Sequence, residues 1–112
     1  MTYDHLLENL IAMGFDDEQV KPVLFDSTSR LFNPPGDSVR TAEHTHHVAV
    51  WLKDGQKCVY DKLAQEARKD GVLGGRQGLQ EYLRLWLHRI LVETAKTGKV
   101  PDPRRTLLIE TE

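Results

Sequence analysis

Two adjoining helical patterns, separated by a glycine-rich turn, constrain the fold of this chain more than any other feature. In the first pattern Val59, Leu63 and Ala67 recur every four residues and Gly71 follows, which is typical of an amphipathic helix that ends at a left-handed glycine. In the second, a wide apolar stripe runs over 79–91 and includes two large aromatic residues. The pair predicts two helices joined by a short turn, with the second helix at the centre of the core.

The remainder of the chain also has mainly helical spacing. A proline- and glycine-containing break at 33–37 separates the front of the chain from the rest. We therefore expect a mainly α protein, a compact bundle of four to five helices. The expected helices cover about 2–13, 16–31, 56–70 and 76–97, with a fifth over 41–53 if that segment is helical.

The segment before the first of these patterned helices permits two interpretations. A helix over 41–53 would gather its apolar residues roughly on one side. A short strand over 46–52 fits equally well, because Val48, Val50 and Leu52 alternate with other residues. In that alternative, a second short strand over 105–110 could lie beside the first. Periodicity alone does not decide between the two.

Charge is distributed unevenly along the chain. Residues 1–52 contain three Lys and Arg against eight Asp and Glu, whereas residues 53–105 contain twelve against seven, and 106–112 form a short acidic tail. This asymmetry indicates a polyanion or an acidic protein surface as a partner for the basic half. At 112 residues we expect a single domain over 1–112, which homodimerisation would help to stabilise.

The chain has no apolar run of about 18 residues, which predicts that it has no membrane span. Its N-terminus is acidic and polar rather than signal-like, so we expect a cytoplasmic protein. A single cysteine, Cys58, excludes an internal disulfide and is expected to be a small core residue. No cofactor is expected.

Three closely spaced histidines are weak candidates for metal ligands. His44 and His47 would share a face of a helix, whereas His44 and His46 would share a face of a strand. Ordinary surface or partly buried histidines beside an interface are the favoured interpretation, so no metal site is predicted. Cys58 has no flanking residues typical of an activated thiol, and no catalytic site is predicted.

The segment 45–93 resembles the ribbon-helix-helix class of DNA-binding proteins. It has a short alternating segment, a helix ending in Ala-Arg-Lys-Asp-Gly, a brief turn, and a helix beginning Arg-Gln-Gly-Leu-Gln-Glu-Tyr-Leu. The resemblance implies that two protomers pair the strand 46–52 into a ribbon for the major groove. It also implies that Gly74, Gly75 and Arg76 hold a backbone phosphate.

A second resemblance covers only 10–24. The run Leu10-Ile-Ala-Met13-Gly14-Phe15, followed by Val20 and Leu24, is similar to the first helix and loop of ubiquitin-associated domains. The resemblance implies that the Met-Gly-Phe loop contacts the surface of ubiquitin.

Two functions follow from these observations. The favoured prediction is a small non-enzymatic helical protein–protein interaction module, such as an adaptor or an inhibitor encoded by a mobile element. The alternative is a dimeric ribbon-helix-helix-like transcriptional regulator that binds DNA. Both use the same candidate contacts for phosphate, DNA or an acidic partner: Arg68, Lys69, Gly74, Gly75 and Arg76.

Overall fold

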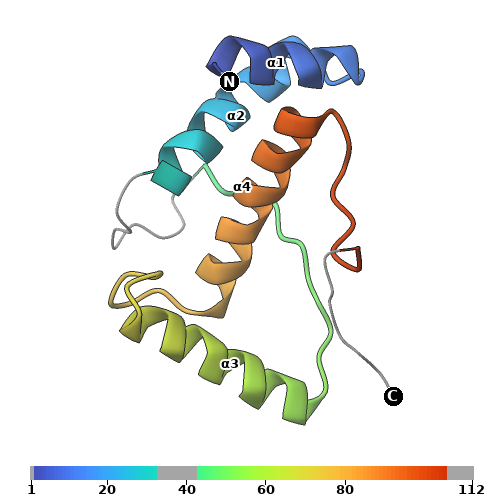
Figure 1. The fold of residues 1–112 in the computed structure, drawn as a ribbon. Helices are drawn as coiled ribbons and strands as arrows, with labels where there is room; N and C mark the ends of the chain where they lie inside the picture. Colours follow the sequence, from blue (N-terminus) through green and yellow to red (C-terminus); the bar gives the residue numbers. More distant parts are fainter. Residues whose placement is uncertain (1, 33–42, 106–112) are drawn as a thin grey trace. The chain divides into compact units, whose positions relative to one another are not determined.

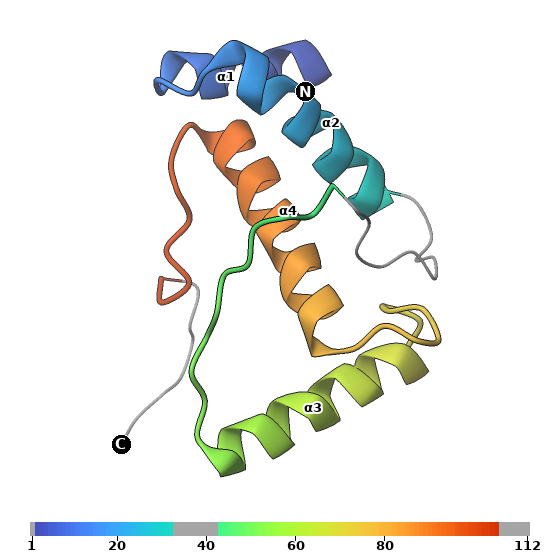
Figure 2. The same ribbon diagram turned by 180° about the vertical axis from the view of Figure 1, so that it is seen from behind.

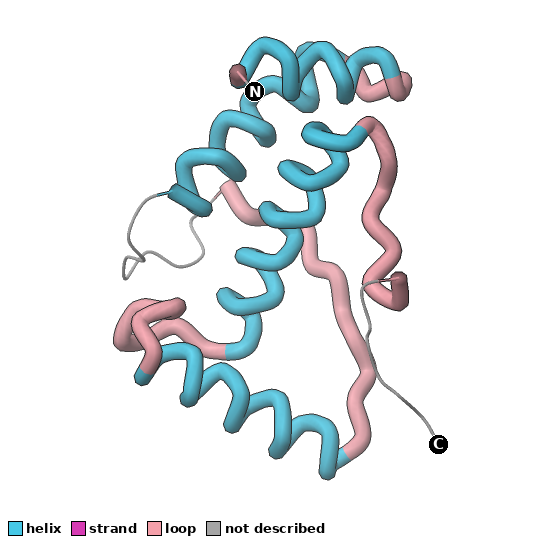
Figure 3. The backbone as a smooth tube through the Cα atoms, viewed as in Figure 1, coloured by secondary structure: helices cyan, strands magenta, loops and turns pink. Residues whose placement is uncertain are grey.

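The computed structural model describes residues 2–32 and 43–105, and these ranges contain four helices and no strand (Figures 1 and 3). The helices are α1 (Tyr3–Ala12), α2 (Asp17–Phe32), α3 (Asp54–Lys69) and α4 (Leu79–Thr97). The predicted mainly α fold with four helices is therefore confirmed. None of the described helices combines the length and the apolar composition that a bilayer crossing requires.

The segment that precedes α3 has neither of the expected regular structures. Residues 43–53 contain no helix and no strand, and Figure 2 shows them as an elongated loop that leads into α3. The prediction of a strand over 46–52 is wrong for this chain on its own, because a strand needs a neighbouring strand to accept its backbone hydrogen bonds. A fifth helix is likewise absent over 43–53, where histidine, threonine and valine are poor helix formers. Of the second expected strand, 105–110, all but Arg105 lies outside the described residues, and Arg105 lies in a turn.

Local side-chain chemistry sets the ends of the first two helices. The Thr2 hydroxyl accepts a hydrogen bond from the His5 amide at 3.3 Å and caps α1. Gly14 has a φ of +100°, and Phe15 N donates back to Leu10 O at 3.2 Å, so the chain turns out of the helix there. The next helix begins after Asp16, whose carboxylate accepts from Gln19 N at 3.0 Å.

The chain divides into two compact units. The first comprises Met1–Leu31 with Leu87–Glu112, and the second comprises Phe32–Trp86. The core of the first unit is formed by buried aliphatic residues from α1, α2 and the second half of α4. These residues are Leu6, Leu10, Val20, Leu24, Val92 and Ala95.

The second unit has a smaller core. Ala64 and Ala67 of α3 pack with Leu73 of the turn, and Leu79 and Tyr82 of α4 lie partly buried against them. Alanine side chains allow α3 and α4 to approach closely but contribute little apolar area. The second patterned helix was expected at the centre of the core, and α4 does contribute Val92 and Ala95 to the first core and the partly buried Leu79 and Tyr82 to the second. Its large aromatic Trp86 is nevertheless exposed.

Candidate interaction surface

The turn between α3 and α4 is organised by the buried side chain of Gln77. The Gln77 Oε1 atom accepts from Gly74 N at 2.7 Å, and Gln77 N donates to Gly74 O at 3.1 Å. The backbone carbonyl of Gln77 also accepts a hydrogen bond from the Arg68 guanidinium at 2.7 Å. Arg68 and Gly74, two of the five predicted contact residues, are therefore joined through one glutamine.

These contacts reduce the number of hydrogen-bond donors and unpaired cations that the predicted phosphate site has for binding an anion. The amide of Gly74 is occupied by Gln77, and the Lys69 ammonium pairs with Glu66 at 3.2 Å. Helix α4 begins at Leu79 rather than near Arg76 as expected, so the amides of 74–76 do not form its N-terminus. The predicted cradle of Gly74, Gly75 and Arg76 is therefore displaced from the helix start.

Arg76 is exposed and is the one of the five candidates that borders a hollow at the start of α4. This hollow of about 370 Å³ is also lined by Lys57, Asp61, Gly78, Leu79, Gln80 and Glu81. Its two cations are matched by two carboxylates, so an anion bound there would face negative charge as well as positive. Arg76 itself has no ion pair with a described residue.

Five charged side chains of α3 form ion pairs with one another. Lys57 pairs with Asp61, and Glu66 accepts from Lys62 at 3.0 Å as well as from Lys69. The hydrogen bond from Lys62 lowers the pKa of the Glu66 carboxyl, with Lys69 adding to the effect. We call these paired charges the rim of the second unit, and their net charge is close to zero.

The apolar faces of α3 and α4 extend beyond the point where the two helices touch. On α3, Tyr60 and Leu63 lie one turn before the buried alanines and on the same helix face. On α4, Leu83 and Trp86 lie one turn after Leu79 and Tyr82. The four outer residues are exposed, Trp86 to 52%, because α3 and α4 diverge as they leave the turn (Figure 1).

We call Tyr60, Leu63, Leu83 and Trp86 the α3/α4 face. The Trp86 ring is held in an edge-on contact with Tyr82, with centroids 6.3 Å apart, so its position is set although it is exposed. Sequence reasoning missed this face, because helical periodicity identifies an apolar stripe and does not show whether the same chain covers it. The repeated spacing on two adjoining helices was the available signal.

The loop before α3 exposes more apolar surface in the same unit. Trp51 is 95% exposed, and Val48 and Val50 are also exposed. An indole this open to water is unusual in a chain that has folded alone, since tryptophan is highly buried on average. The second unit therefore has two sources of uncovered apolar area.

His44, His46 and His47 lie in the loop before α3 and are exposed. In 2–32 and 43–105 no three His, Cys, Asp or Glu side chains come together in a way that could hold a metal ion, and His44, His46 and His47 belong to no such group. Cys58 is exposed on the second turn of α3, so the expectation that it is a core residue is wrong.

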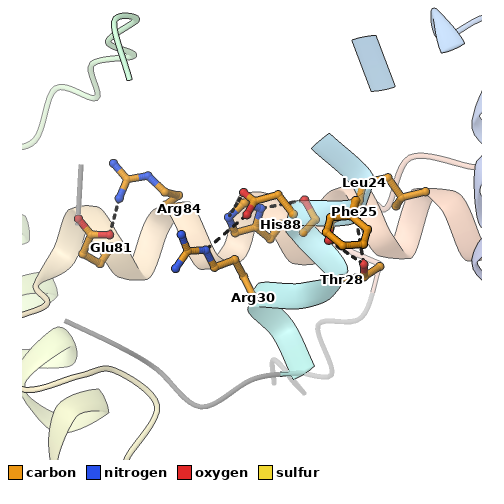
Figure 4. Close-up of polar contacts among 9 residues, drawn as sticks. Leu24, Phe25, Thr28, Arg30, Glu81, Arg84 and His88 are labelled. Atoms are coloured by element: carbon orange, nitrogen blue, oxygen red, sulfur yellow. Dashed lines mark hydrogen bonds and ion pairs between the residues drawn. The ribbon is translucent and has the colours of Figure 1, made fainter. Parts of the chain in front are cut away.

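In the first unit, the side chains of a serine, a histidine and an aspartate lie near one another, but without the contacts of a hydrolase triad, in which the serine bonds Nε2 and the aspartate bonds Nδ1 of the histidine. Ser27 Oγ lies 2.8 Å from His88 Nδ1, and Asp26 Oδ2 lies 4.0 Å from His88 Nε2. Figure 4 shows His88 of α4 and Arg30 of α2 close to one another. Arg30 also approaches Asp26, at 3.5 Å. Ser27 is only 1% exposed, so its hydroxyl cannot reach a substrate, and the contact joins α2 to α4.

The loop after α1 places the Met-Gly-Phe residues at the surface. Met13 and Phe15 are both exposed on either side of Gly14. The residues that would begin a third helix in a ubiquitin-associated domain fall in 33–42, outside the described residues. That resemblance stays a prediction.

Comparison with protein-family models, with curated proteins and with solved structures finds no match for this chain.

Proposed function

We propose that this protein is a non-catalytic interaction module that binds another polypeptide through the α3/α4 face. The observation that carries the proposal is the exposure of four large apolar side chains on two adjoining helices, each one turn from a residue of the core of the second unit. Exposed apolar patches rimmed by polar residues mark protein–protein contact sites, and tryptophan is among the residues that contribute most to such contacts. Trp86, fixed by Tyr82, has the character of such an anchor.

The proposal is tested with immobilised protein as bait in an extract of cells that also produce the untagged chain, comparing the wild type with Trp86→Ala. Because Trp86 is half exposed, its removal should leave the fold intact while removing the anchor. Val23→Glu is a matched control, since Val23 is an exposed apolar residue on α2 of the first unit. We expect the Trp86→Ala bait to lose proteins that the wild type and the control both retain, and equal retention by all three baits would count against the proposal.

A second candidate is DNA binding by a dimer, and the observation that favours it is Arg76. This side chain is exposed, has no ion pair with a described residue, and lies in the turn that follows Arg68 and Lys69 at the end of α3. A residue that contacts a phosphate contributes about 0.9 to the slope of log affinity against log salt. If the protein binds duplex DNA, Arg76→Ala should reduce that slope by about one, whereas Lys99→Ala in the first unit should not.

A further inference from the structure

We infer that the occupant of the α3/α4 face is a second copy of this chain. The inference rests on the proposed function, since it names the partner for the same surface. Each protomer contributes the α3/α4 face together with the exposed loop residues Val48, Val50 and Trp51, and the pair covers both sets at once.

The exposed area of these residues decides whether such a pair can be stable. With roughly 200 Å² for an aromatic side chain and roughly 100 Å² for a valine or leucine, the α3/α4 face exposes about 300 Å² per protomer. Two such faces would bury about 600 Å², less than the roughly 1,000 Å² that a specific interface needs.

The loop residues bring the area into the range of stable dimers. Trp51, Val48 and Val50 add about 300 Å² per protomer on the same scale, so two protomers would bury about 1,200 Å². This value is at the lower end of the range for standard interfaces. The dimer therefore requires Trp51 as well as the α3/α4 face.

The charges of the rim fit a second copy better than a strongly charged partner. Three cations of α3 and of the first half of α4 form ion pairs within their own helices, Lys57 with Asp61, Lys62 with Glu66, and Arg84 with Glu81. A highly acidic or basic partner would find few unpaired charges to recognise. A second copy brings the same neutral rim, so the two surfaces can approach without repulsion between like charges.

The test measures the mass of the full chain by analytical ultracentrifugation over about a hundredfold range of concentration. We expect the mass to rise from the 12.8 kDa of one chain to twice that value. Leu63→Glu, Trp86→Ala and Trp51→Ala should each weaken the dimer by about tenfold or more, because each removes or opposes a large part of a small interface. Val23→Glu, which alters an exposed residue of the first unit, should dimerise as the wild type does.

A second readout follows the environment of one indole directly. In Trp51→Phe, which keeps an aromatic ring in the loop, Trp86 is the one remaining tryptophan. Its emission should shift to shorter wavelength as concentration rises, over the same range in which the mass doubles. Circular dichroism of each variant confirms that the helices are retained, so a loss of dimer is not a loss of fold.

Three results would overturn the inference: a wild-type protein that stays monomeric at the highest concentration, a dimer that the face and loop variants leave intact, or a control variant that is equally impaired. These results are separable from failure of the proposed function. A monomer whose bait loses a partner on Trp86→Ala refutes the dimer and leaves the interaction module standing. A monomer whose baits all retain the same proteins refutes both.

Discussion

Leucine-to-alanine substitutions at Leu10 and Leu87 should have very different costs, although the chemical change is the same. Leu10 is 0% exposed in the core of the first unit, whereas Leu87 on α4 is 63% exposed. Removing a fully buried leucine costs about 2–5 kcal/mol, because the lost transfer energy adds to the energy of the cavity. Only about a third of Leu87 is buried, so truncating its side chain to alanine should cost about 0.5–1 kcal/mol.

The measurement is urea unfolding followed by circular dichroism, at a protein concentration low enough to keep the chain monomeric. We expect the free energy of unfolding to fall by at least about 2 kcal/mol for Leu10→Ala, a large share of the roughly 5–15 kcal/mol of a typical domain. A difference between the two variants below about 1 kcal/mol would refute the assignment of Leu10 to a packed core.

Three further outcomes are expected. Ser27→Ala should lower the free energy of unfolding by about 1–3 kcal/mol, since it removes the buried hydroxyl that contacts His88, and an unchanged urea midpoint would contradict this. Gln77→Ala should lower the free energy of unfolding by a similar amount, about 1–3 kcal/mol, because the Gly74 amide loses its acceptor. Hydrogen exchange of the amides in this turn should become faster, and unchanged protection would contradict the turn structure. The folded-state pKa of Glu66 lies below its ordinary value of 4.5, so the stabilisation that this carboxylate provides is present at neutral pH and is lost as pH falls through the lower pKa. In Lys62→Ala the Glu66 carboxyl should titrate closer to 4.5 when followed by NMR. An unchanged pKa in this variant would exclude Lys62 as the main cause of the shift.

The helices were predictable because their apolar residues recur at helical spacing and because capping residues and glycines mark their ends. Gly71 has a φ of +77° directly after α3, as its place after the apolar pattern predicts. Val48 and its neighbours were not predictable in the same way, since the same alternation suits a strand when a partner strand is present and a loop when it is not.

The candidate site was predictable only in part. The charge pattern led to the turn after α3, where Arg68 and Gly74 are joined, but it could not show that Gln77 occupies the amide of Gly74. The apolar stripe that includes Trp86 predicted a core position. Whether a stripe is buried depends on which other elements reach it, and that information is distributed over the whole chain rather than held in the stripe.

The helix α4 has a role in both compact units, because the division between them falls after Trp86, within its length. In an α-helix each amide donates to the carbonyl four residues earlier, so the amides of 87–90 are bonded to carbonyls of 83–86. Neither unit can melt its own share of α4 without removing hydrogen bonds from the other. Any ligand that rigidifies the first half of this helix should therefore slow hydrogen exchange at the amides of 87–90.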